Sequence, residues 1–120
     1  MTTTSIELDV PGALKRVGGD RELLARIIDF VVEDSPQFLT RIETALKDNK
    51  YAEVELAAHS LKGLVSNLHC VAVQEKATEI EGLARNHNRD AITQAFAILE
   101  DLTQKMMLKI DEIRHKLATE

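Results

Sequence analysis

Apolar residues recur every three or four positions along most of this 120-residue chain, and this spacing limits its fold more than any other feature. An α-helix turns by about 100° per residue, so residues spaced in this way share one helical face. One long run follows Asp20 and comprises Leu24, Ile27, Ile28, Val31, Phe38, Leu39, Ile42 and Leu46. Another follows Asp90 and comprises Ile92, Ala95, Phe96, Leu99, Leu102, Met106, Ile110, Ile113 and Leu117. Both segments are predicted to form amphipathic helices.

Residues with known preferences at helix ends predict where the first two helices begin and end. Asp9 and Pro11 are typical of a helix start, and Gly18-Gly19 would end the short helix that follows. Asp20 can cap the second helix. We expect this helix to continue through Pro36 with a kink, because its apolar face resumes in phase beyond the proline.

Turn residues delimit the remaining helices. The polar group 47–50 marks a turn before a third helix, predicted over residues 51–69. A fourth helix is predicted from about Val73 to a turn at 86–88, and a fifth from Asp90. Short connections between long amphipathic helices favour antiparallel neighbours. The sequence therefore predicts an all-α fold, an antiparallel up-and-down four-helix bundle with a short extra N-terminal helix across one end.

Length, charge and cysteine content exclude several classes of protein. The chain is long enough for one domain, predicted over residues 9–118 behind a flexible tail of residues 1–8. A net charge of −5 argues against a nucleic-acid-binding protein. Cys70, the single cysteine, excludes an internal disulfide, and the sequence shows neither a signal peptide nor the roughly 18 apolar residues of a membrane span. We expect a monomeric, cytoplasmic protein or domain that binds neither nucleic acid nor membranes.

The predicted third helix carries the residues that indicate chemistry. Its apolar side comprises Val54, Ala57, Ala58, Leu61, Leu64, Val65 and Leu68. His59, Lys62, Gly63 and Ser66 lie on the other side, so an imidazole faces solvent with a cation at i+3 and a glycine at i+4. A glycine inside a helix costs about 1 kcal/mol relative to alanine. The room at Gly63 would let a bulky group approach the ring of His59 or be carried on it.

A small apolar strip surrounds this histidine on the helical wheel. The strip comprises Ala52, Leu56, His59, Gly63 and Cys70. Such a strip can dock a partner around a central polar group. The candidate docking residues are Ala52, Leu56, Ser66 and Cys70.

The run Ala58-His59-Ser60-Leu61-Lys62-Gly63, followed by Asn67-Leu68, resembles the signature of histidine-containing phosphotransfer (HPt) domains. Upstream, residues 14–20 with Leu23-Leu24 and Phe30 resemble the first part of that family's bundle. The resemblance implies that His59 accepts a phosphoryl group from an aspartyl phosphate on a receiver domain and passes it to another receiver in a multistep two-component phosphorelay. It also implies that Lys62 is a cation near the phosphate and Gly63 the access position.

Two places depart from the pattern of that family. Leu64 and Val65 stand where small or hydroxylated residues are common, and His69 stands where a glycine is common. Leu64 and Val65 fall on the core face, so we expect them to affect packing more than chemistry. His69 should affect how the helix ends.

Transfer through a histidine requires an exposed, unprotonated ring nitrogen and nearby positive charge. Lys62 supplies a cation, and Gln37 on the second helix is a candidate neighbour of His59. The sequence shows no Gly-rich phosphate loop and no carboxylate cluster for Mg²⁺ beside the histidine. We therefore expect a phosphoryl carrier with no intrinsic cofactor and no metal site, not an enzyme. The partner, a response-regulator receiver domain or a hybrid histidine kinase, would supply Mg²⁺ and the catalytic groups.

Three other interpretations explain parts of the sequence. A di-iron bundle uses two Glu-x-x-His pairs, whereas this chain has one, Glu112 and His115, away from the apolar face. A helical protein-binding module that resembles HPt domains but is never phosphorylated is the second, and the intact motif counts against it. The third is the dimerisation and phosphoacceptor region of a histidine kinase. Against it, Ser60 stands where that region has an acidic residue, and no proline follows Pro36.

Overall fold

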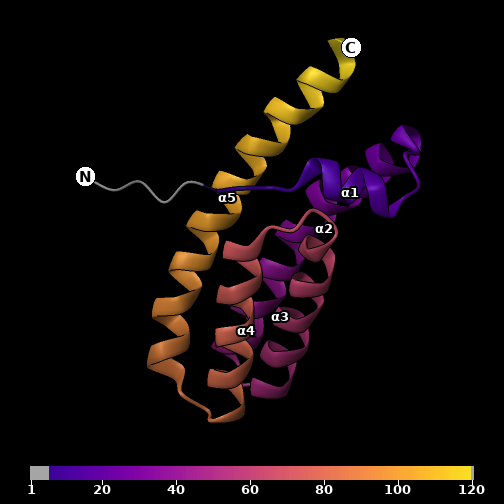
Figure 1. The fold of residues 1–120 in the computed structure, drawn as a ribbon. Coiled ribbons are helices and arrows are strands. Elements are labelled where there is room, and N and C mark those ends of the chain that lie inside the picture. The colour runs from indigo at the N-terminus through magenta and orange to yellow at the C-terminus, as the bar shows by residue number, and fades with distance from the viewer. Residues whose placement is uncertain (1–5, 120) are drawn as a thin grey trace.

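The computed structural model describes residues 6–119, which form five helices and no strand. The helices are α1 (Val10–Arg16), α2 (Arg21–Lys47), α3 (Tyr51–Ser66), α4 (Val71–Arg85) and α5 (Arg89–Thr119). Both α2 and α4 pack against α3 and against α5, so the four long helices form a closed ring. Consecutive long helices run in opposite directions, and α1 lies at the end of the bundle where α2 begins (Figure 1). The predicted all-α, antiparallel four-helix bundle with an extra N-terminal helix is confirmed.

The starts of α1 and α2 follow from their capping residues. The Asp9 carboxylate accepts a hydrogen bond of 2.9 Å from the backbone N–H of Gly12. The Asp20 carboxylate accepts one of 3.0 Å from the N–H of Leu23. Between the two helices, Gly18 and Gly19 have φ of +67° and +79°, a conformation that favours glycine. The predicted caps and the turn between these helices are confirmed.

Helix α2 passes through Pro36 without a break. Residues on both sides of the proline, among them Val31 and Ile42, are fully buried on the same face. Burial of this common face stabilises one long helix even though the proline lacks an N–H to donate. The prediction of one helix in place of two is confirmed.

Helix α3 is shorter than predicted, because it ends at Ser66 and not at His69. His69 adopts a left-handed conformation with φ of +53°, which stops the helical path and starts the turn into α4. Cys70 then precedes the first turn of α4 and is fully buried. The prediction that Cys70 lies on the exposed strip is therefore wrong.

Residues 6–8 pack against the bundle and do not form part of a loose tail. Ile6 is buried, Leu8 is half-buried against the core, and the N–H of Asp9 donates to the carbonyl of Leu68. The guanidinium of Arg16 donates to the carbonyls of Ser66 and Asn67, the last residue of α3 and the one after it. These hydrogen bonds connect the end of α1 to the end of α3. The tail predicted over residues 1–8 is wrong for 6–8, and residues 1–5 lie outside the described part of the chain.

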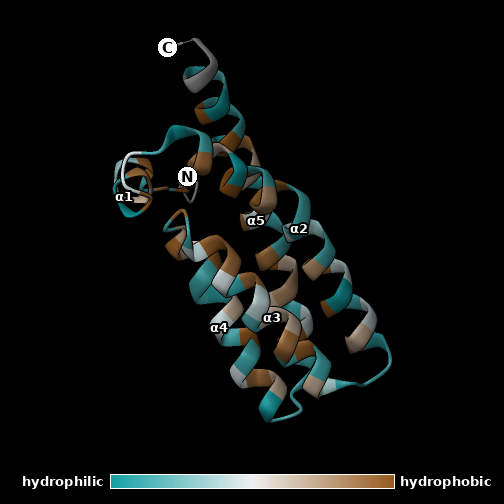
Figure 2. Ribbon diagram, turned by 90° about the vertical axis from the view of Figure 1, so that its right-hand side faces the viewer, coloured by the Kyte–Doolittle hydropathy of each residue, from teal (hydrophilic) through white to brown (hydrophobic). Residues whose placement is uncertain are grey.

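The core is aliphatic, and hydrophobic and hydrophilic residues alternate along each long helix (Figure 2). The largest fully buried side chains are Leu24, Ile42, Leu61, Leu68, Ile80, Ile92, Leu99, Met106, Ile110, Val31, Val54 and Val65. They come from all four long helices and from the turn after α3, so the core fixes the rotation of each helix about its axis. Within residues 6–119, no helix is both long and apolar enough to cross a membrane.

Candidate functional site

The buried face of α3 determines where His59 points. Val54, Ala58, Leu61 and Val65 are all fully buried. Because His59 is not on the face that these residues occupy, its imidazole lies at the surface with 66% of the side chain exposed. The predicted exposure of His59 is confirmed.

A buried carboxylate from the neighbouring helix lies against the imidazole. Glu81 of α4 has only 5% of its side chain exposed, and its Oε2 lies 3.4 Å from Nδ1 of His59. Its other oxygen, Oε1, lies 2.8 Å from Nζ of Lys62. Lys62, the cation predicted beside His59, is therefore bound to a carboxylate that also contacts His59 and that was not predicted from the sequence. The missed signal is that Glu81 lies one turn from Ala77 and one turn from Ala84 on the buried face of α4.

Glu81 is ionised in the folded protein. Burial raises the pKa of this carboxyl, but hydrogen bonds from Lys62 and His59 and the positive charge of Lys62 outweigh burial and hold the pKa below its ordinary value of 4.5. The site at neutral pH therefore contains a fixed negative charge beneath the imidazole.

The charge on Glu81 selects one form of the histidine. An ionised carboxylate can only accept hydrogen bonds, so its contact with Nδ1 favours the tautomer that carries the proton on Nδ1. Nε2 of that tautomer has a free lone pair. The arrangement therefore leaves Nε2 as the ring nitrogen that could act as a nucleophile, while Nδ1 faces a buried anion.

His59 lies in a surface hollow of about 660 Å³ between α3 and α4. The other residues that line the hollow are Ala52, Glu55, Leu56, Lys62, Glu81 and Arg85. Arg85 contacts both acids: its Nε lies 2.6 Å from Oε2 of Glu55, and its Nη2 lies 3.5 Å from Oε2 of Glu81. The hollow therefore contains two cations and two carboxylates around one imidazole.

Two of the predicted docking residues line this hollow. Ala52 and Leu56 are exposed next to His59, with Leu56 66% exposed. Gly63 does not line the hollow, but it is exposed, and a Cβ added there would meet no heavy atom within 4 Å. The space that the sequence predicts at Gly63 is present.

Three other candidates lie elsewhere or have other partners. Ser66 is the last residue of α3, half-buried, and its hydroxyl donates to the carbonyl of Gly63. Burial raises the pKa of the Cys70 thiol, which is enclosed in the core. The amide of Gln37 donates to the carbonyl of Glu33 in its own helix. Of these three residues, none lines the hollow at His59.

The described residues contain no group of three or more His, Cys, Asp or Glu side chains that could hold a metal ion. The absence of an intrinsic cofactor stays a prediction.

The shifted pKa of Glu81 predicts how stability depends on pH. A carboxyl whose pKa is lower in the folded state contributes stability above its unfolded pKa and loses it as pH falls through the folded value. We expect the difference in unfolding free energy between the wild type and Glu81→Gln to be largest at neutral pH and to shrink as pH falls below about 4.5. Urea denaturation at a series of pH values measures this difference. The matched variant Glu79→Gln, at a half-exposed position on the same helix, should show a smaller dependence, and an equal one would contradict the account.

Comparisons with known proteins agree with this fold. The family model of the Hpt domain matches residues 26–116. A crystal structure of histidine-containing phosphotransfer protein B (HptB) from Pseudomonas aeruginosa PAO1 superimposes with a TM-score of 0.83 at 21% identity, covering 91% of this chain and 95% of that one. The HPT domain of a sensor hybrid histidine kinase from Shewanella superimposes with a TM-score of 0.76 at 18% identity, covering 91% and 94%. No curated protein sequence matches significantly. Because the family model spans most of its length, this chain belongs to the Hpt domain family, whose members are phosphocarrier modules with a histidine phosphotransfer role in phosphorelays.

Proposed function

We propose that this protein carries a phosphoryl group on Nε2 of His59, accepting it from an aspartyl phosphate on a receiver domain and passing it to another receiver. The observation that carries the proposal is the exposed imidazole whose Nδ1 faces the buried, ionised carboxylate of Glu81. The carboxylate leaves Nε2 as the free nucleophile at the surface. Proteins of the Hpt family act in phosphorelays together with receiver domains or hybrid kinases, which fits this chemistry.

The transfer step balances with the groups at this site. The lone pair of Nε2 forms a bond to phosphorus while the bond between phosphorus and the aspartate oxygen breaks, and the aspartate leaves as a carboxylate. The ring keeps its proton on Nδ1 and becomes cationic, and Glu81 stabilises this positive charge. The reverse step delivers the phosphoryl group to the next aspartate. The receiver would supply Mg²⁺ and the catalytic groups, so this chain acts as a carrier and not as an enzyme.

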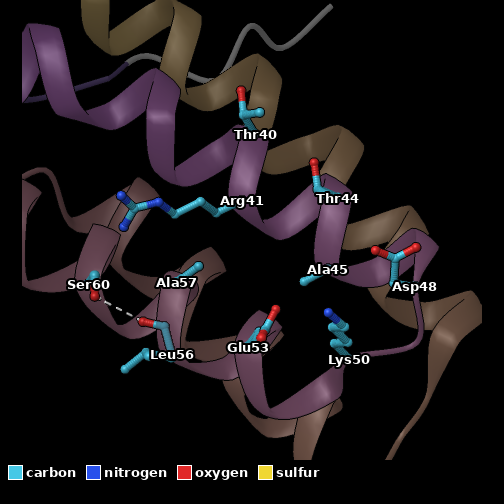
Figure 3. A pocket seen from close by; sticks show the side chains of 10 residues that line it. All are labelled: Thr40, Arg41, Thr44, Ala45, Asp48, Lys50, Glu53, Leu56, Ala57 and Ser60. Atoms are coloured by element: carbon cyan, nitrogen blue, oxygen red, sulfur yellow. Dashed lines mark hydrogen bonds between the residues drawn. The ribbon is translucent and has the colours of Figure 1, made fainter.

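We place the docking surface for the receiver around Leu56. This residue lines the hollow at His59 and also a second groove, of about 520 Å³, between α2 and α3. The second groove is lined by Thr40, Arg41, Thr44, Ala45, Asp48, Lys50, Glu53, Leu56, Ala57 and Ser60. Side chains from the two helices face each other across it (Figure 3). A partner seated on Leu56 can therefore contact this groove while its aspartate reaches His59.

We expect Leu56→Glu to weaken receiver binding by about tenfold, because it places a charge in the apolar centre of the proposed interface. Titration calorimetry with an unphosphorylated receiver domain measures the affinity. Val71→Glu is the matched control, since Val71 is also exposed but lies at the start of α4. Equal affinities for the two variants would show that Leu56 lies outside the interface.

Two substitutions of Gly63 should distinguish its effect on access to the histidine from its effect on helix stability. Gly63→Ala should raise the free energy of unfolding by about 0.5–1 kcal/mol, since the added Cβ meets nothing. Gly63→Trp should slow transfer from a receiver by about tenfold or more, because an indole would occupy the approach to the ring. Stopped-flow transfer and urea denaturation measure the two effects. Gln104→Trp, at an exposed position on α5, is the control, and an unchanged rate in Gly63→Trp would remove the access argument.

The proposed function is tested with a phosphorylated receiver domain and Mg²⁺. Intact-mass measurement should show one added phosphoryl group on this protein, and acid treatment should remove it, as the P–N bond of phosphohistidine is acid-labile. Addition of a second, unphosphorylated receiver should return the protein to its original mass. Failure of several receivers to phosphorylate the folded protein would overturn the proposal in favour of a binding module that is not phosphorylated.

A further inference from the structure

Arg85 and His59 line the same hollow. Oε2 of Glu81 has Nδ1 of His59 at 3.4 Å and Nη2 of Arg85 at 3.5 Å, so the ring and the guanidinium share one oxygen atom as a neighbour. The side chain of Arg85 is 61% exposed, so it has room to turn on its flexible stem. A modest rotation would bring its N–H groups towards a phosphoryl group on Nε2.

Lys62 and Arg85, the two cations of the hollow, differ in how unfavourable it would be to break their ion pairs. Lys62 pairs with Oε1 of Glu81, a buried carboxylate that would lose its nearest charge partner if the ammonium moved away. Such a loss is unfavourable, because a buried charge depends on its partners. Arg85 pairs most closely with Glu55, which is partly exposed and can be solvated in its absence. Arg85 is therefore the cation that can change partners at low cost.

Phosphorylation would disturb the charge balance of the hollow. Before it, Lys62 and Arg85 balance Glu55 and Glu81. A phosphoryl group brings about two negative charges and oxygen acceptors to the rim. A guanidinium can bind such oxygens with two parallel hydrogen bonds. A carboxylate at the rim would compete with the phosphoryl oxygens for the same guanidinium.

Resting on the function proposed above, we propose that Arg85 binds the phosphoryl group on His59 and that Glu55 competes for the same guanidinium. The Glu55–Arg85 pair then controls how long the phosphoryl group remains on the histidine. In hydrolysis, water attacks phosphorus, the bond between phosphorus and Nε2 breaks, inorganic phosphate leaves, and Nε2 recovers its lone pair. The transition state is loose and metaphosphate-like. Metaphosphate carries one negative charge, whereas the phosphoryl group on the ring carries about two. A cation bound to these oxygens stabilises the ground state more and slows the loss.

Potassium phosphoramidate tests this proposal without any docking partner. Nε2 attacks the phosphorus of this small donor, the P–N bond of the donor breaks, and ammonia leaves. After removal of the donor, intact-mass measurement follows the loss of the phosphoryl group over time. We expect Arg85→Gln to lose the phosphoryl group two- to fivefold faster than the wild type, and Glu55→Gln to lose it more slowly by a similar factor. This range corresponds to the energy of an exposed ion pair. Arg85→Lys should fall between the wild type and Arg85→Gln, because lysine keeps the charge without the two parallel bonds.

Lys76→Gln is the control, since Lys76 is a cation on the same helix that pairs with Glu79 and does not line the hollow. Equal lifetimes for Arg85→Gln and Lys76→Gln would overturn the proposal, as would a shorter lifetime in Glu55→Gln. The Nε–H signal of Arg85 in an NMR spectrum should also move when the wild type is phosphorylated, while that of Arg41 stays in place. An unmoved Arg85 signal would contradict the proposal. A folded wild type that takes no phosphoryl group from either phosphoramidate or a receiver would refute the proposed function itself, and this result is seen before any lifetime is compared.

Discussion

Replacement of His59 by glutamine is expected to abolish phosphorylation and to leave the helical bundle intact. The amide of glutamine offers no nucleophilic nitrogen to phosphorus, so no transfer should be detected. The imidazole is largely exposed, and a substitution at such a position changes the free energy of unfolding by about 0.5 kcal/mol or less. Intact-mass measurement after incubation with a phosphorylated receiver reports the first effect, and thermal denaturation followed by circular dichroism reports the second.

His115→Gln is the matched control for this variant. His115 is an exposed histidine on α5, the helix across the ring from α3, so its replacement should leave phosphorylation unchanged. A phosphoryl group on His59→Gln would show that another residue is the acceptor. Global unfolding of the same variant would contradict the placement of the imidazole at the surface.

The second large effect is expected at Glu81. Glu81→Gln should slow phosphorylation of His59 by about tenfold or more, the size of effect seen when the hydrogen-bond partner that orients a metal-binding histidine is removed. A neutral amide gives less support to the positive charge that the ring acquires. It can also donate to Nδ1 and so favour the tautomer that carries its proton on Nε2, which cannot attack. Phosphoramidate and a phosphorylated receiver should both reveal the loss, because the defect lies in the nucleophile and not in docking.

The control for Glu81→Gln is Glu79→Gln, on the same helix and paired with Lys76. Its rate should equal that of the wild type. A role of Glu81 in stability alone would leave the rate per folded molecule unchanged in Glu81→Gln. That result would contradict the orientation of the imidazole by the carboxylate.

Most of the fold could be predicted from local signals in the sequence. Asp9 and Asp20 marked helix starts because a short side-chain acceptor satisfies a free N–H of the first turn. The apolar face that continues past Pro36 predicted one helix, since burial outweighs the missing hydrogen bond. The end of α3 was placed too late, because His69 adopts a left-handed φ without being a glycine, so the usual signal was missing. The error at Cys70 follows from the same residue, as a wheel continued past Ser66 no longer describes the chain.

The candidate site was predictable where it depends on a single helix. The exposure of His59 and the space at Gly63 follow from the periodicity of α3 alone. Glu81 was missed because it is 22 positions from His59, and the contact depends on how α3 and α4 pack. Helical wheels treat one helix at a time and cannot pair residues across two. The packing of Ile6 against the core likewise depends on tertiary contacts.

The central claim is that Nε2 of His59 carries the phosphoryl group, and NMR of the phosphorylated protein with ¹⁵N-labelled histidine tests it most directly. Coupling between ³¹P and a ring nitrogen identifies both the residue and the atom of attachment. The account predicts a coupling to Nε2 of His59, together with a proton retained on Nδ1. Coupling to Nδ1 of His59 would contradict the role of Glu81, and coupling to another histidine would contradict the assignment of the site.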